Sequence, residues 1–398
     1  MKNKLNLSKI PKEVLFILEL LEDDNKGLFQ KKNHLLYSDL DWQLFVDYAT
    51  HHRLYPVLYN KVKQLDEPLL PDSVLQSLKE LYKENTYKML QLSGEMSFIN
   101  NLLYENRIKT IFLKGPILAK DLYGDISLRT SGDLDFLIPI ERIDEAEKLL
   151  VEQGYKRKDN FDRILNDWKF RNHHVTYFHP HKRITLEIHW RLHPGPARET
   201  NFQDLWERKR ESNLTASPIS YLGKEDLFHF LVVHGARHGW YRLRWLHDIH
   251  QIMKQSLNWD LVYALFKKNH HVPHAGQALI LASQLFGTKL TNDVHVLINN
   301  KQAFPLAQKA IFYLGRMENL HSPTVSKDIT QYHKHYILSS NSIQTRCLMI
   351  ITKFYPSSVD AVTLPLPKYM HFLYFPLRPI LSIYRKIKKP ILLKEDIR

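Results

Sequence analysis

The sequence is short of cysteine and glycine, and each shortage narrows the class of protein. Cys347 is the only cysteine among 398 residues, so an internal disulfide and a cysteine-built zinc site are excluded, and a reducing compartment is expected. The chain contains 13 glycines. Together with long stretches rich in Leu, Lys and Glu, this scarcity favours a mainly helical protein around a modest sheet.

Long apolar runs, internal repeats and low-complexity segments are also missing. Because no run of about 18 uninterrupted apolar residues occurs, a membrane-spanning helix is not expected. The N-terminal stretch MKNKLNLSKIPKEVLFILELLEDD has lysines before a short apolar patch, but the patch contains Glu19 and lacks a small-residue cleavage site. It predicts an amphipathic helix rather than a signal peptide. These features predict a cytoplasmic protein.

Basic residues outnumber acidic residues in the sequence. The chain has 56 Lys and Arg against 42 Asp and Glu, a net charge of +14. This balance favours polyanionic partners such as nucleotides, nucleic acid or an acidic membrane surface. The tail, residues 341–398, holds 10 basic and 3 acidic residues and therefore contributes half of the excess.

The hydrophobic pattern divides the chain into four predicted regions. Residues 1–95 and 201–340 repeat apolar side chains at helical spacing, which predicts a helical N-terminal region and a helical C-terminal domain. Residues 96–200 form the predicted core, and residues 341–398 form the basic aromatic tail. The predicted fold class is α+β, with a small mixed sheet and flanking helices.

The core region reads as a series of strands and short helices. KTIFL, residues 109–113, predicts a strand that passes through Lys114, Gly115 and Pro116 into a helix, ILAKDLYG. DLDFLIP predicts a second strand and ERIDEAEKLLVEQGY a helix. HHVTYFHPHKRITLEIHW predicts two strands joined by a tight turn at residues 179–182.

Acidic side chains lie on two of these predicted strands. Successive side chains of a strand point to opposite faces, so Asp133 and Asp135 share one face. Glu187 lies on the polar face of the second hairpin strand, where it could also pair with Arg183. If the two strands are neighbours, three carboxylates converge and form an oxygen-ligand site for Mg²⁺ or Mn²⁺.

The turn at Lys114 and Gly115 has a different property. A strand, a glycine turn and a helix N-terminus present backbone N–H groups and partial positive charge to an anion, and Lys114 adds a full charge. A carboxylate-bound divalent ion facing a phosphate-binding turn suits phosphoryl or nucleotidyl transfer.

These motifs carry a family resemblance. The run FLKGPILAKDLYGDISLRTSGDLDFLI, followed by ERIDEAEKLLVEQGY and LEIHWRLH, resembles the polymerase-beta-type nucleotidyltransferase superfamily, and within it the bacterial uncharacterised nucleotidyltransferase family. The resemblance includes the LKG turn, an arginine before an Asp-x-Asp strand and an acid-x-His-Trp strand. It extends to THHRLYPVLYNKV and HGARHGWYRLRWLHDIHQI, and so covers residues 30–290 approximately.

The resemblance implies a role for each matching residue. Asp133, Asp135 and Glu187 would be the catalytic carboxylates that ligate Mg²⁺ or Mn²⁺, and Glu187 would also help to deprotonate the attacking hydroxyl. The candidate nucleotide-binding residues are Lys114, Gly115, Arg129 and Ser131. The superfamily's usual turn is Gly-Gly or Gly-Ser, and the Lys-Gly-Pro sequence here has neither the second glycine nor the hydroxyl.

The implied function is metal-dependent transfer of a nucleoside monophosphate from a nucleoside triphosphate such as ATP to an acceptor hydroxyl or phosphate, with release of pyrophosphate. The acceptor could be a small molecule, a peptide, a protein or RNA. A second hypothesis is a binding module for nucleotide or RNA whose catalytic site has decayed. The third is a metal phosphohydrolase built from histidines and an aspartate, with candidate residues His234, His238, His247, Asp248 and His250.

Other interpretations of these residues stay open at this point. Arg129 could be a salt-bridge partner rather than a substrate contact. The histidines fit equally well on a packed helix bundle in which Arg237, His238 or Asp248 borders the active cleft. The tail could be a solvated terminal segment, interrupted by Pro376, Pro379 and Pro390, or a peripheral contact for an anionic surface. The residues proposed for that contact are Arg385, Lys386, Lys388, Lys389, Phe372, Tyr374 and Tyr384.

Overall fold

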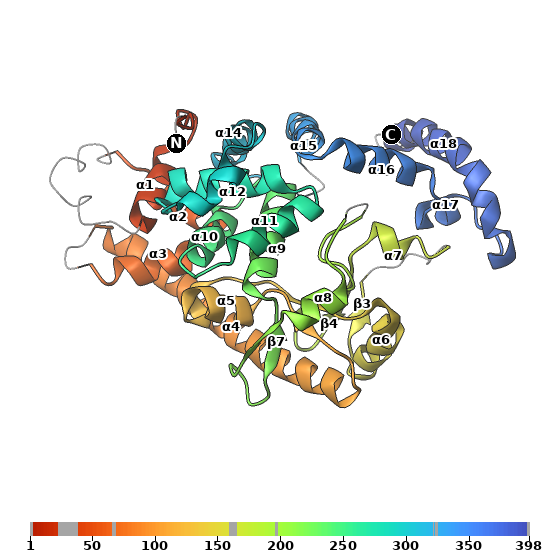
Figure 1. The fold of residues 1–398 in the computed structure, drawn as a ribbon, viewed down its shortest axis with the longest axis horizontal. Helices are drawn as coiled ribbons and strands as arrows, with labels where there is room; N and C mark the ends of the chain where they lie inside the picture. Colours follow the sequence, from red (N-terminus) through yellow and green to blue (C-terminus); the bar gives the residue numbers. More distant parts are fainter. Residues whose placement is uncertain are drawn as a thin grey trace. The chain divides into compact units, whose positions relative to one another are not determined.

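The computed structural model describes residues 3–22, 39–65, 69–158, 165–195, 198–320, 322 and 325–395. The chain forms two compact units, residues 1–136 with 200–341 and residues 137–199 with 342–398 (Figure 1). The boundary falls inside a strand, β2 (Leu134–Leu137). The predicted helical regions at 1–95 and 201–340 belong to the same unit. The four regions predicted from the sequence are defined by hydrophobic pattern and not by compactness. Their boundaries therefore stay a prediction.

The first unit is mainly helical. Its longer helices are α1 (Lys12–Leu21), α2 (Trp42–His51), α4 (Asp72–Glu105), α9 (Lys224–Arg237), α10 (Leu243–Ile252), α11 (Trp259–Lys268), α12 (Val272–Phe286), α14 (Ala303–Leu314) and α15 (Lys327–Ser340). The shorter ones are α3 (Tyr55–Val62), α5 (Pro116–Tyr123), α8 (Phe202–Glu207), α13 (His295–Ile298) and the 3₁₀ turns η3 (Ile126–Leu128) and η5 (Asn292–Val294).

Several of these helices begin at a polar capping residue. The Asp41 side chain accepts a hydrogen bond from the backbone N–H of Leu44 at 2.9 Å, and Asn258 accepts one from Leu261 at 3.1 Å. Such a cap satisfies an N–H that has no helical acceptor and contributes about 0.5–2 kcal/mol. The capping residues therefore fix where α2 and α11 start.

Helix α12 lies in the core of the first unit and contacts α9, α10 and α14. Residues 274–282 of this helix are all buried. Gly276 permits the close approach, because a Cβ there would lie 2.3 Å from the Leu297 carbonyl oxygen and 2.6 Å from the Ala303 Cβ. A helix buried on every side is expected in the core of a large helical unit.

The strands form one seven-stranded sheet. Their order is β3 (Lys156–Arg157), β4 (His174–His179), β5 (Ile184–His189), β2, β1 (Ile111–Phe112), β7 (Ile219–Tyr221) and β6 (Arg210–Ser212). β1 and β7 pair in parallel, whereas β3 with β4, β4 with β5, and β6 with β7 pair antiparallel. The prediction of an α+β protein with a mixed sheet and flanking helices is therefore confirmed.

The predicted hairpin is confirmed. β4 and β5 pair through the whole length of both strands, and the Arg183 N–H closes the turn on the His179 carbonyl at 2.8 Å. The helix predicted after the glycine turn is also confirmed as α5, with Pro116 at its first position.

The prediction that residues 201–340 are entirely helical is wrong at β6 and β7. These strands have three residues each, so they are too short for a periodic pattern to form. Their position depends on contacts that are distant in sequence. Phe112 of β1 lies opposite Tyr221 of β7, and Arg210 of β6 makes two hydrogen bonds of 2.8 Å to Asp121 of α5.

The second unit contains β3, β4 and β5 with the helices η4 (Ile140–Arg142), α6 (Ile143–Glu152), α7 (Trp168–Arg171), α16 (Ile343–Phe354), α17 (Ser358–Thr363), η6 (Lys368–Leu373) and α18 (Tyr374–Glu395). The predicted interruption of the tail by prolines is wrong, since α18 runs through all three of them. Pro376 lies in its first turn, where the missing N–H has no helical acceptor to lose.

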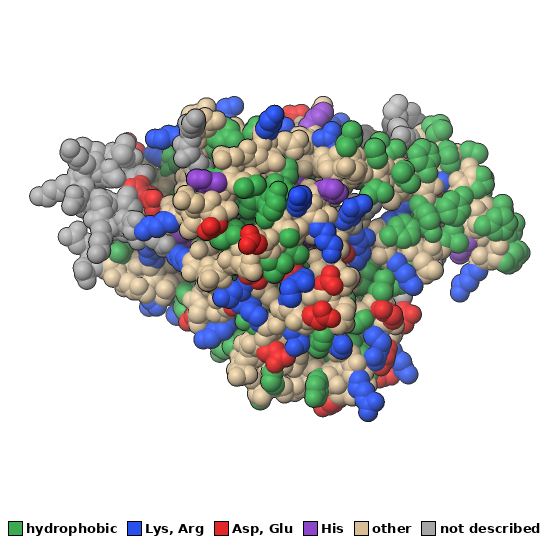
Figure 2. All heavy atoms as spheres, viewed as in Figure 1, with side chains coloured by type: hydrophobic (Ala, Val, Ile, Leu, Met, Phe, Trp, Pro, Cys, Tyr) green, Lys and Arg blue, Asp and Glu red, His purple; other side chains and the backbone are tan. Residues whose placement is uncertain are grey.

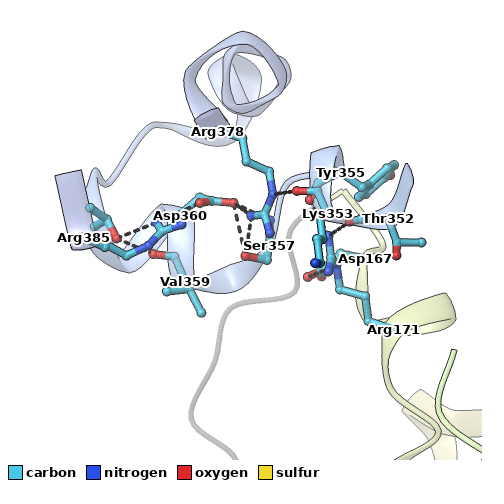
Figure 3. Close-up of polar contacts among 11 residues, drawn as sticks. Asp167, Arg171, Thr352, Lys353, Tyr355, Ser357, Val359, Asp360, Arg378 and Arg385 are labelled. Carbon is cyan, nitrogen blue, oxygen red and sulfur yellow. Dashed lines mark hydrogen bonds and ion pairs between the residues drawn. The ribbon is translucent and has the colours of Figure 1, made fainter. Parts of the chain in front are cut away.

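Asp360 organises the tail helices (Figure 3). It caps α17 through Ser357 and forms ion pairs with Arg378 and, at 2.9 Å, with Arg385. Burial alone would raise the pKa of Asp360, but the Ser357 N–H and the two arginines outweigh burial and lower it. Arg171 of α7 donates to the Thr352 carbonyl at 2.7 Å. The Nε of Arg378 also donates to the Lys353 carbonyl of α16. These contacts hold α16, α17 and α18 together and join α16 to α7.

Apolar side chains are exposed along the tail, and Figure 2 shows them gathered over α17 and α18. Phe372 is 62 % exposed, Ile380 62 % and Ile383 59 %. The side chains of residues 386 and 388–395 lie outside the described residues, and with them the predicted contacts of Lys386, Lys388 and Lys389. Among the described residues, no helix is both long enough and apolar enough to span a bilayer.

Candidate functional site

The glycine turn lies against the strand that carries the two aspartates. The Leu113 N–H at the end of β1 donates to the Asp135 carbonyl of β2 at 2.9 Å. Gly115 then takes φ 80° and ψ −147° as the residue that caps α5. A Cβ at Gly115 would lie 3.2 Å from a Leu134 methyl carbon and 3.9 Å from the Asp133 carbonyl oxygen. Positive φ and close packing both require glycine here.

The two aspartates differ in their surroundings. The Asp135 side chain is 1 % exposed, and the Lys114 Nζ lies 3.4 Å from its Oδ1. Asp133 precedes β2 and is half-buried, and its carbonyl accepts from the Ser131 hydroxyl at 3.1 Å. A buried carboxylate is costly unless a positive charge compensates it. Lys114 therefore supplies part of the charge that the acidic pair requires.

Arg129 binds another side chain of the protein. Its Nε and Nη2 each donate to Asp248 of α10 at 2.9 Å, and both side chains are almost completely buried. The Tyr123 hydroxyl also donates to Asp248, at 2.8 Å. Burial alone would lower the pKa of Arg129 and raise that of Asp248, but their mutual attraction reverses both shifts. The role of Arg129 as a triphosphate contact stays a prediction, and the structure supplies a structural role for it.

Two further arginines matter here: Arg53 lies near Asp133, and Arg244 lies near Arg53 and Arg129. The pKa of Arg53 is lowered by burial and by Arg242, and Asp133 opposes the shift. Burial also lowers the pKa of Arg244 well below its usual range, and the nearby cations Arg129 and Arg53 add to this effect. Buried cations that repel one another favour the binding of an anion, because its negative charge offsets the repulsion.

Arg244 is held in place by the segment that precedes the aspartates. Its Nη1 donates to the Thr130 carbonyl and, at 2.9 Å, to the Thr130 hydroxyl. Within the part of the chain that the structure describes, its buried Nε has no hydrogen-bond acceptor. Arg244 thus contacts Thr130, the residue before Ser131 in sequence, and its Nε–H is a further hydrogen-bond donor.

The histidines proposed for the phosphohydrolase are used in helix packing. His247 Nδ1 lies 3.1 Å from the Tyr123 hydroxyl, and His250 Nδ1 lies 2.8 Å from the Thr288 hydroxyl. The rings of His234 and His238 pack on Trp245, with centroids 5.3 Å away in both cases. Because both oxygens of Asp248 accept from Arg129, the structure favours the packed-bundle interpretation.

Glu187, the third predicted carboxylate, lies on β5, which follows β2 in the order of the sheet. Its Oε2 lies 3.3 Å from His189 Nε2 and 3.7 Å from His174 Nδ1. The alternative partner Arg183 lies in the hairpin turn with φ 56°. Glu187 therefore has two histidine neighbours, His189 and His174.

Sequence reasoning missed Arg53, Arg244, His173 and His174. The segments that contain both arginines belong to the quoted resemblance, but helical periodicity does not reveal which cation faces the aspartates. The two histidines begin the predicted hairpin, and a count of its register would have placed His174 opposite His189.

The family of the chain follows from comparison with known proteins. The chain belongs to the family described as uncharacterised nucleotidyltransferase, whose model matches residues 38–287 of its 398. The match includes the glycine turn, both aspartates and Glu187, and it confirms the resemblance inferred from the sequence. Membership supports a nucleotidyltransferase at this general level. No curated protein matches the chain.

Proposed function

We propose that the protein is a metal-dependent nucleotidyltransferase that moves a nucleoside monophosphate from a nucleoside triphosphate to an acceptor hydroxyl or phosphate and releases pyrophosphate. One observation carries the proposal. The Gly115 turn, which opens helix α5, lies within van der Waals distance of the segment that carries Asp133 and Asp135. A phosphate-binding turn beside a carboxylate pair is the arrangement that nucleotidyl transfer requires.

The acidic side chains fit a hard divalent cation. Asp135 is buried and Asp133 half-buried, so their charges are poorly screened by water, and both offer the oxygen donors that Mg²⁺ and Mn²⁺ prefer. When bound, the ion would be held by Asp133, Asp135 and the proposed third ligand Glu187, and would neutralise charge on the triphosphate. Glu187 belongs to the second unit, and its part in the site stays a prediction.

The cationic side chains fit the triphosphate. Gly115 places the first N–H groups of α5, with their partial positive charge, next to the aspartates. Arg53 and Arg244 are partly or fully buried cations whose mutual repulsion an anion would relieve. Lys114 is held by Asp135 and adds charge at the same turn. Positioning and charge neutralisation by these groups supply most of the rate in reactions of this type.

The experiment uses purified full-length protein with each α-labelled nucleoside triphosphate, Mg²⁺ and a cell extract as the source of acceptor. We expect label to move to an acceptor, and this transfer to be lost in Asp133→Ala and Asp135→Ala. Asp260→Ala, which changes an exposed aspartate at the start of α11, is the matched control and keeps the activity. The mass of the labelled product identifies the acceptor class.

The phosphate-binding part is tested separately from the chemistry. Arg53→Met and Arg244→Met are expected to weaken nucleoside triphosphate binding by about tenfold each, since a hydrogen bond to a charged group contributes about 1.5–3 kcal/mol. Nucleotide binding that survives every substitution, without any transfer, would support the decayed binding module instead. Phosphate release that depends on His247 and Asp248 would support the phosphohydrolase.

A further inference from the structure

Three histidines and one glutamate converge in the second unit, at the end of the β4–β5 hairpin away from its turn. This histidine cluster consists of His173, His174, Glu187 and His189. One ring nitrogen from each of the three histidines lies within 4.8 Å of those of the other two. The Glu187 Oε2 lies beside two of them, 3.3 Å from His189 Nε2 and 3.7 Å from His174 Nδ1.

The distances between these atoms suit a small cation. A tetrahedral zinc site with Zn–N bonds near 2.05 Å separates its ligand atoms by about 3.3 Å. The His173 Nε2 and His174 Nδ1 atoms are 3.1 Å apart, and the Glu187 Oε2 lies 3.3 Å from His189 Nε2 and 3.7 Å from His174 Nδ1. Three printed contacts among these four side chains are therefore close to the ligand spacing of one bound ion.

The orientation of His189 adds a second argument. Its Nδ1 lies 3.3 Å from the Arg191 carbonyl oxygen, which can only accept, so a hydrogen bond here places the proton on Nδ1. In a neutral ring the Nε2 lone pair then points at the Glu187 Oε2, and two acceptors face each other at 3.3 Å. A proton or a metal ion between them is required. A backbone carbonyl on the far nitrogen is the usual support for a metal-binding histidine.

The backbone holds the cluster rigidly. His174 of β4 lies directly opposite His189 of β5, so both side chains emerge on the same face of the hairpin. Glu187, two residues before His189, shares that face. The His173 carbonyl accepts from the Trp190 N–H at 3.0 Å, which fixes the fourth residue against the end of β5. A site built on paired strands needs little rearrangement to bind a ligand.

We propose that the histidine cluster binds a divalent first-row transition metal ion, with Zn²⁺ as the favoured ion. Three imidazoles and one carboxylate form a nitrogen-rich donor set that selects Zn²⁺ and its neighbours over Mg²⁺ or Ca²⁺. The site differs in chemistry from the proposed oxygen site at the two aspartates. It shares Glu187 with the proposed function but does not rest on it, since all four residues belong to the second unit and no nucleotide is needed.

The test measures metal binding by the full-length protein without a polyhistidine tag, after treatment with a chelator. Titration with Zn²⁺ or Co²⁺ is followed by calorimetry and by the visible absorption of bound Co²⁺. We expect about one ion per chain, retained in excess Mg²⁺. His174→Gln and Glu187→Gln should each lower the affinity at least about tenfold. His181→Gln, at the exposed hairpin turn, is the matched control and should bind as the wild type does.

Two further variants decide the remaining outcomes. If His174→Gln does not fold, as judged by circular dichroism, His173→Gln replaces it, because His173 lies outside the strand and is half-buried. Asp133→Asn should bind the metal normally even though it abolishes nucleotidyl transfer. The proposal is overturned if the wild type binds no transition metal, if the histidine variants bind it unchanged, or if Asp133→Asn weakens binding equally. In the absence of metal binding, a protonated His189 paired with Glu187 explains the geometry.

Discussion

The buried pair of Arg129 and Asp248 allows a quantitative test of what holds the acid-bearing segment in place. Asp248→Asn keeps the size of the side chain and removes its charge. The carboxylate is 0 % exposed and accepts from Arg129 twice and from Tyr123 once. After the substitution, Arg129 and Arg244 remain as two buried cations that have lost an acid stabilising both of them.

The magnitude follows from the burial of both partners. Removing one partner of a buried ion pair costs about 3–5 kcal/mol, because the other charge stays desolvated. Arg129→Met should cost less than Asp248→Asn, since Asp248 still has Arg244 and Tyr123 as stabilising neighbours. The double variant should cost less than the sum of the single ones, with a coupling of about 1–3 kcal/mol.

Urea unfolding followed by circular dichroism measures these differences in the free energy of unfolding. Glu211→Gln is the control, because its ion pair with Lys209 is half exposed and should contribute less than about 1 kcal/mol. The pKa of Asp248 is lowered in the folded state, so its contribution is present above the unfolded value near 3.9 and lost only as pH falls through the folded pKa. A loss below about 1 kcal/mol for Asp248→Asn, or a larger loss for Arg129→Met, would refute this reasoning.

Three other properties of the structure lead to measurable expectations. Gly115→Ala should cost about 1–3 kcal/mol at a backbone conformation that favours glycine, as a lower thermal midpoint, and should weaken nucleotide binding; an unchanged midpoint would contradict the turn geometry. Burial lowers the pKa of His52 and of His229 to about 3, so the stability they contribute is complete above pH 6.5 and falls on acidification. For each of these two histidines, the free energy of unfolding should fall by about 2 kcal/mol between pH 7 and pH 5, measured by urea unfolding. Equal stability at both pH values would argue against their burial. Ile380→Ser with Ile383→Ser should reduce cosedimentation with vesicles rich in phosphatidylserine, because both side chains are exposed on the basic tail. Binding that the double substitution leaves intact would exclude this surface.

The glycine turn, the acid-bearing strand and the hairpin could be predicted because each is encoded over a few consecutive residues. Proline after glycine opens α5, and alternation of apolar and polar side chains marks β5. The arginines near the aspartates could not be predicted in this way. Arg53 and Arg244 belong to segments almost two hundred positions apart in sequence, and only tertiary packing brings Arg53 and Arg129 close to Arg244.

The histidine cluster lies between these two cases, since its geometry follows from the register of the predicted hairpin. A hairpin with His179 paired to Ile184 keeps the sum of paired residue numbers constant along both strands. That register places Thr176 opposite Glu187 and His174 opposite His189. Once the turn is located, convergence of these side chains needs only the strand repeat of two. Register therefore carries chemical information in this chain: a slip of one residue would move the donor atoms to opposite faces and remove any site for a metal.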